Sequence, residues 1–168
     1  MEMLQNVLVE TIAGLVGIFI GTLAALAVER YKERLQNRRR ARTVLRSLAQ
    51  ELAENHRTLQ AVRPAYAQTP FGKSFFVSTI AWETALAGGD LPAIIGVELA
   101  DAVAAQYALL VRIRYYVDLL TRLWFAPAEI PGHESIQRGF TQAILETTTQ
   151  AIGSHPRVAG AIERALQR

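Results

Sequence analysis

The chain has 168 residues, a formal net charge of +3 and no cysteine, which excludes disulfides, thiolate metal sites and thiol catalysis. The positive charge is local. Residues 29–46 hold eight basic side chains against Glu29 and Glu33, giving +6, and the rest of the chain sums to −3. This distribution argues against a broadly basic nucleic-acid-binding domain, and the length allows one modest core.

Residues 11–28 contain no charged side chain, and a cluster of arginines begins two residues later. At about 1.5 Å per residue, a helix of this length crosses most of a hydrocarbon core about 30 Å thick. Val7 to Val9 lengthen the apolar stretch to 7–28, interrupted by Glu10. The pattern predicts one N-terminal transmembrane helix.

The basic residues indicate how this helix is oriented. Ala25-Leu26-Ala27 fits the cleavage pattern of a signal peptide, but Met1 to Asn6 contain no Lys or Arg and include Glu2. We therefore favour an uncleaved anchor, with cleavage as the alternative. By the positive-inside rule, the N-terminus faces out and residues 29–168 lie in the cytoplasm, at the inner (plasma) membrane.

The helical pattern continues after the span. No Gly or Pro occurs between Lys32 and Arg63, so we predict that the first helix runs to about residue 62 and stops before Pro64. Its heptad stripe consists of Leu45, Leu48, Leu52, Asn55, Leu59 and Val62. We expect this stripe to face other helices of the same chain, with pairing between copies as the alternative.

Prolines and glycines divide the remainder into further helices. Thr69 is the expected N-cap of the second helix, and Gly88-Gly89 ends it. The third helix is loosened at Gly96, and Gly153 ends the fourth. The predicted ranges are 70–87, 92–125, 134–152 and a short helix after Pro156. The third helix carries an unbroken apolar stripe, but its charged side chains exclude a second membrane span.

No segment alternates like a strand, so we predict an all-α fold. One N-terminal transmembrane helix continues into a soluble antiparallel bundle of four or five helices. The expected domains are a membrane anchor at 1–28, a basic juxtamembrane and amphipathic helix at 29–63, and a bundle domain at 64–168 that packs on 43–63.

Two sets of residues in the N-terminal region are candidate contact sites. The small residues Ala13, Gly17, Gly21 and Ala25 recur every four positions, which favours close packing with a second copy or another membrane protein. Small residues are also common in spans generally, so an inert face is the alternative. Glu10 lies beside this stripe, either as a proton or cation ligand or solvated at the outer interface.

The second set is basic, and its expected role is contact with anionic lipid headgroups, worth about 1 kcal/mol per side chain. Its members are Arg30, Lys32, Arg34, Arg38, Arg39, Arg40 and Arg42. Setting the orientation of the span would by itself explain these residues. Nucleic-acid binding is disfavoured because Tyr31 is the one interleaved aromatic residue.

We expect no catalytic residue, cofactor or metal, and therefore no enzyme. His133-Glu134 begins like a zinc-protease motif, but Gln137 stands where the second histidine belongs. His56, His133 and His155 share no ligand spacing on one helix face. The alternative is an enzyme or small-ligand sensor with a site between the second and third helices. There Trp82 and Trp124 could line an aromatic pocket beside Gln106.

The segment from Ser78 to Leu91 reads Ser-Thr-Ile-Ala-Trp-Glu-Thr-Ala-Leu-Ala-Gly-Gly-Asp-Leu and is followed by a helix containing Tyr107. With the anchor and the arginine-rich helix, it resembles small uncharacterised bacterial proteins that carry one N-terminal transmembrane helix and a helical cytoplasmic domain. The resemblance implies an inner-membrane location and no activity. We thus expect an interaction or scaffold protein, self-associating or docked to a membrane partner. The alternative is an accessory subunit of a transporter or channel.

Overall fold

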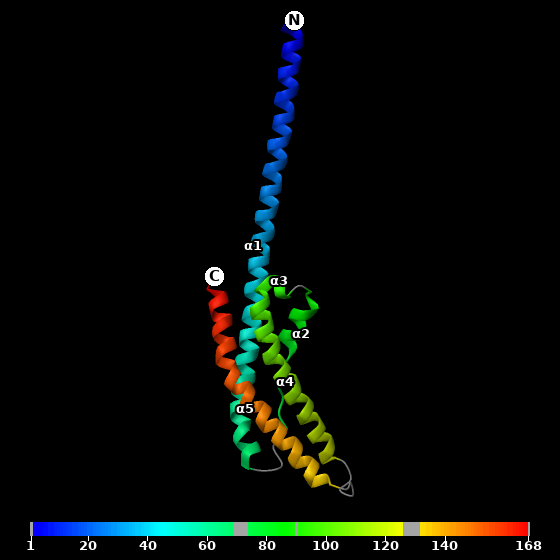
Figure 1. The fold of residues 1–168 in the computed structure, drawn as a ribbon, viewed down its shortest axis with the longest axis vertical. Helices are drawn as coiled ribbons and strands as arrows, with labels where there is room; N and C mark the ends of the chain where they lie inside the picture. Colours follow the sequence, from blue (N-terminus) through cyan, green and yellow to red (C-terminus); the bar gives the residue numbers. More distant parts are fainter. Residues whose placement is uncertain (1, 69–73, 90, 126–131, 168) are drawn as a thin grey trace. The chain divides into compact units, whose positions relative to one another are not determined.

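The computed structural model describes the backbone of residues 2–68, 74–89, 91–125 and 132–167, and the side chains in these ranges from Phe19 onward. Within them the chain forms five helices and no strand, which confirms the predicted all-α class (Figure 1). The helices are α1 (Glu2–Gln68), α2 (Ile80–Ala87), α3 (Leu91–Ile95), α4 (Val97–Trp124) and α5 (His133–Leu166).

The chain divides into two compact units, residues 1–40 and residues 41–168. The first unit is the N-terminal part of α1. No helical segment among the described residues has the length and hydropathy needed to cross a bilayer. Residues 11–18 of the predicted span lie outside the residues whose side chains are described, as do Glu10, Ala13 and Gly17.

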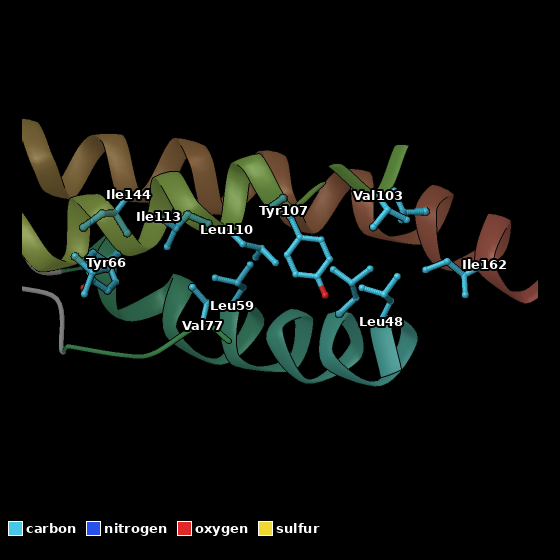
Figure 2. Close-up of a cluster of buried hydrophobic side chains, with 14 of the residues drawn as sticks. Leu48, Leu59, Tyr66, Val77, Val103, Tyr107, Leu110, Ile113, Ile144 and Ile162 are labelled. Atoms are coloured by element: carbon cyan, nitrogen blue, oxygen red, sulfur yellow. The ribbon is translucent and has the colours of Figure 1, made fainter. Parts of the chain in front are cut away.

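The second unit has a core between three long helices, the C-terminal part of α1, α4 and α5 (Figure 2). The stripes predicted for the first and third helices point into it, as their spacing indicates. The fully buried side chains of this core include Leu48 and Leu59 of α1, Val103, Tyr107, Leu110 and Ile113 of α4, and Ile144 and Ile162 of α5. Hydrophobic contact between these side chains is the main source of stability in a domain of this size.

The helix directions differ in part from the predicted antiparallel arrangement. α4 and α5 are antiparallel neighbours, but α1 and α4 run in the same direction, because the segment before α4 returns along the bundle (Figure 1). In that segment residues 74–79 are not helical, and Val77 is fully buried against the core. The return segment therefore contributes to the packing as well as connecting two helices.

The predicted end of the first helix at residue 62 is wrong, since α1 continues through Pro64 to Gln68. Proline has no N–H, so one backbone hydrogen bond of the helix is lost there. Burial offsets this loss. Tyr66 is buried and packs edge-on against Phe75, with ring centroids 5.7 Å apart.

The predicted start of the second helix at residue 70 is also wrong, because α2 begins at Ile80 with Thr79 as its N-cap. The predicted N-cap, Thr69, lies outside the described residues. Asn55 and Glu51 of α1 hydrogen-bond the backbone of Ser78 and Ala81, and thereby determine where the helix begins. The prediction was based on local spacing and could not include these contacts.

Gly96 separates two helices, whereas Gly153 lies within one. Gly96 has a φ of 87°, a conformation that favours glycine, and it separates α3 from α4 instead of loosening one helix. Gly153 was expected to end a helix, but α5 passes through it and through Pro156. The reason is one continuous buried stripe on both sides of that break, formed by Ala151, Val158 and Ile162.

Candidate functional site

Glu51, on the buried side of α1, accepts hydrogen bonds from three other parts of the chain. The Tyr107 phenol donates to Oε1 at 2.6 Å. The Ser78 hydroxyl donates to Oε2 at 2.5 Å and the Ala81 N–H donates to the same oxygen at 2.9 Å. The Ala81 N–H lies in the first turn of α2, so Glu51 caps that helix from outside.

The neighbouring side chains complete this arrangement, which we call the Glu51 cluster: Glu51, Asn55, Ser78, Trp82 and Tyr107. Asn55 lies one turn after Glu51 and pairs with the backbone of Ser78. Its Nδ2 donates to the Ser78 carbonyl at 2.7 Å, and its Oδ1 accepts from the Ser78 N–H at 2.8 Å. Trp82 stacks on Tyr107, with ring centroids 5.0 Å apart and an interplanar angle of 12°.

The hydrogen bonds determine the charge state of the cluster. Burial alone would raise the pKa of Glu51, but the bonds from Ser78, Tyr107 and Ala81, with the backbone N–H of Trp82 beside them, together lower it below its ordinary value of 4.5. Burial and the adjacent carboxylate raise the pKa of Tyr107. At neutral pH the cluster therefore holds one carboxylate and one neutral phenol.

A second set of contacts ties α2 to α4. The Thr79 hydroxyl donates to Glu83 at 2.6 Å, and Arg114 donates to the Thr79 hydroxyl at 3.2 Å. Arg114 also lies over the ring of Phe76, 5.8 Å from its centroid. Its ion pair with Glu83 spans 3.9 Å and is more than half exposed, so it contributes little.

A depression of about 440 Å³ lies beside the Glu51 cluster, between α1 and α2. Ser47, Glu54, Ile80 and Thr84 are among its lining residues, with Glu51 at its inner side. Because both oxygens of Glu51 already accept hydrogen bonds, three in all, it could act as a general base only by releasing one of them. The arrangement is suited to holding α2 in place rather than to acid–base chemistry.

Trp82 and Trp124 do not line a common pocket, which was the alternative interpretation of these two residues. Trp82 contacts Tyr107, whereas Trp124 lies seventeen residues after Tyr107 in α4, about 26 Å along the helix axis. Gln106 faces α5 instead. Its Nε2 donates to the Ala151 carbonyl at 3.0 Å, and its Oε1 accepts from the Ser154 hydroxyl at 2.6 Å.

The three histidines lie in two places. Nε2 of His133 is 2.9 Å from the Leu123 carbonyl, at the C-terminal end of α4. His56 and His155 stack across α1 and α5, a pairing that residue spacing along a single helix face does not reveal. Within the described part of the chain, no group of three or more His, Asp or Glu side chains could hold a metal.

The seven basic residues of the predicted lipid-contact set are all exposed: Arg30, Lys32, Arg34, Arg38, Arg39 and Arg40 in the N-terminal unit, and Arg42 just after it. Gly21 and Ala25 are the described members of the small-residue stripe. A Cβ placed on Gly21 would meet no atom within 4 Å, so this face of the helix is open in the single chain.

No family model, no curated protein and no solved structure matches this chain.

Proposed function

We propose that the protein is a single-pass membrane-anchored interaction or scaffold protein without enzymatic activity. Its N-terminus faces out, its helical domain lies in the cytoplasm, and it associates with itself or with another membrane protein. The observation that carries this proposal is the exposure of the large apolar side chains on α1. The described ones between residues 19 and 28 are Phe19, Ile20, Leu23, Leu26 and Val28.

These side chains do not share one stripe. At 100° per residue they are spread over more than half of the helix circumference, and Phe19 is 66% exposed. Burying an apolar side chain of this size is worth about 1.5–3 kcal/mol, so five exposed ones in water are costly. A lipid phase covers all sides of a helix at once, which fits this distribution better than one protein groove.

The exposed basic residues support the same placement. They follow the apolar stretch directly and point to several sides of the helix, as phosphate headgroups around a span require. Arginine residues at the end of a span also resist translocation, which supports a cytoplasmic location for residues 29–168.

The domain itself supports an interaction role. The polar groups of the Glu51 cluster hydrogen-bond one another and the backbone of α2, so both carboxylate oxygens and the phenol hydrogen have partners within the domain. Gly17, Gly21, Ala13 and Ala25 offer a face where a second helix could approach closely in lipid.

Membrane anchoring is tested by carbonate extraction of membranes from a bacterial host that expresses the full chain. We expect the wild type in the pellet. A Leu23→Arg, Leu26→Arg variant is expected in the supernatant, since each arginine costs about 2.5–3.5 kcal/mol near the centre of a span. Ile136→Arg, at an exposed position of α5, is the matched control and stays in the pellet. Wild-type protein in the supernatant would overturn the proposal.

Self-association is tested by the mass of the full chain in mild detergent. We expect an oligomer for the wild type and a smaller species for a Gly17→Ile, Gly21→Ile variant, because the larger side chains keep two helices apart. Leu26→Ile is the control and leaves the mass unchanged. A wild-type monomer that copurifies with no other membrane protein would contradict the interaction role.

A further inference from the structure

The imidazole rings of His56 and His155 stack between α1 and α5. Their centroids are 4.1 Å apart and their planes differ by 16°. The Nδ1 atom of each ring is buried and has no hydrogen-bond partner. Two ionisable rings are thus held face to face. An N–H group at either Nδ1 would have no hydrogen-bond acceptor.

The surroundings of the pair offer little compensation for a positive charge. The residues one turn from the rings on the buried sides of α1 and α5 are apolar: Leu52, Leu59, Ala151 and Val158. Charged side chains in the neighbouring turns of the packed helices are exposed: Glu54 and Arg57 on α1, Glu98 and Asp101 on α4 and Arg157 on α5. Glu51 is nearby on α1, but its carboxylate accepts the hydrogen bonds of its own cluster.

We propose that this stack is a proton-sensitive contact, closed when both rings are neutral and opened on acidification by release of residues 155–166 of α5 from α1. Parallel rings direct their lone pairs side by side instead of toward one point, which disfavours a shared metal ion in this geometry. The proposal does not depend on membrane anchoring, because both histidines belong to the helical domain.

The electrostatics agree in sign with this proposal. Burial first, and then the neighbouring His56, lower the pKa of His155 from its ordinary value of 6.5. The opened form, with the ring in water, therefore binds a proton more tightly than the closed form. The contact is complete above about pH 6.5 and weakens as the pH falls toward the lowered value.

One backbone hydrogen bond of α5 is missing next to the stack. Pro156 follows His155 and has no N–H to donate to the carbonyl of Ile152. The Ser154 hydroxyl lies 2.9 Å from the Gln150 carbonyl and 2.6 Å from Oε1 of Gln106, so it links this turn to α4. Opening at this point would release the turns that carry Val158 and Ile162 and leave the preceding turns on α4.

The test is amide hydrogen exchange of the full chain in detergent between pH 7.5 and pH 5, corrected for the intrinsic pH dependence of exchange. We expect protection of residues 157–166 to fall by up to about tenfold per pH unit below 6.5 for each proton taken up on opening. Protection of residues 106–117 of α4 should stay constant over the same range.

A His56→Phe, His155→Phe variant keeps two stacked rings without a titrating group, and it should show no pH dependence in residues 157–166. His133→Gln is the matched control and should respond like the wild type. Histidine ring proton shifts of the wild type provide a readout that does not depend on the variants, and we expect one ring of the pair to titrate below pH 6.5. Constant wild-type protection, a response that persists in the double variant, or two unshifted titrations would each overturn the proposal.

Discussion

The two ends of helix α1 contain similar apolar side chains in opposite surroundings. Leu23 in the N-terminal unit is 52% exposed, whereas Leu52 in the helical domain is 2% exposed. Between residues 45 and 62 the leucines keep to one stripe, and the charged residues other than Glu51 are exposed on the other sides. Between residues 19 and 28 the apolar side chains point to several sides. A one-sided stripe is satisfied by neighbouring helices, while an apolar surface on several sides needs an apolar solvent or several partners.

The largest expected effect separates these two ends. Leu52→Ala removes a fully packed side chain and should lower the free energy of unfolding of the domain by about 3–5 kcal/mol. The matched change Leu23→Ala removes the same atoms from an exposed position in the other unit and should leave the unfolding of the domain unchanged.

The two tryptophans make this measurement selective, because Trp82 and Trp124 both lie in the helical domain. Urea unfolding of the full chain in detergent, followed by tryptophan fluorescence, therefore reports the domain alone. Equal effects of the two substitutions would mean that the N-terminal helix and the domain unfold as one unit, and the contrast between them would be lost.

The two regions also differ in where their charged side chains lie. The basic residues of the N-terminal unit remain in solvent, and the domain instead encloses one carboxylate among hydrogen-bond donors from three segments. A solvated charge is nearly neutral for stability, but a buried one is tolerated only when its oxygen atoms are satisfied. Replacing even one atom in the Glu51 cluster should therefore lower the stability of the domain.

Periodicity predicted the helical class and the buried stripes of α1 and α4, since burial of one helix face follows directly from residue spacing. It failed where tertiary contacts override a local signal. Pro64 and Gly153 predict helix ends, yet buried residues beyond each of them keep the helix continuous. Residues 74–79 read as helical, yet they form no helix, and Asn55 pairs with the backbone of Ser78 within them.

The Glu51 cluster was only partly visible in the sequence. The segment around Trp82 stood out as unusual, and the large apolar and aromatic residues favoured a core role. Glu51 gave no signal, because a glutamate on an amphipathic helix normally faces solvent. Its partners Ser78 and Tyr107 lie far along the chain, and the His56–His155 stack likewise joins two distant helices. Such contacts depend on topology, which spacing within one helix does not encode.

The next prediction, smaller in size, tests the buried carboxylate. Glu51→Gln keeps the shape of the side chain but replaces an acceptor oxygen by an NH₂ group that faces hydroxyl and N–H donors. We expect a loss of about 2–3 kcal/mol in the free energy of unfolding, because at least one buried donor is left unsatisfied. Glu54→Gln is the matched control. Glu54 is exposed, and its substitution should change the stability by less than about 0.5 kcal/mol.

The pH dependence distinguishes a lost carboxylate from general damage to the packing around Glu51. Because the folded-state pKa of Glu51 lies below its ordinary value of 4.5, the stability it contributes is present above that value and is lost as the pH falls through the folded pKa. The stability gap between wild type and Glu51→Gln should therefore narrow below pH 4.5, as the wild-type carboxyl becomes protonated. Fluorescence-monitored unfolding at pH 7 and at a series of lower pH values measures this gap. A gap that stays constant would assign the loss to packing and would contradict the role of the charge in holding α2.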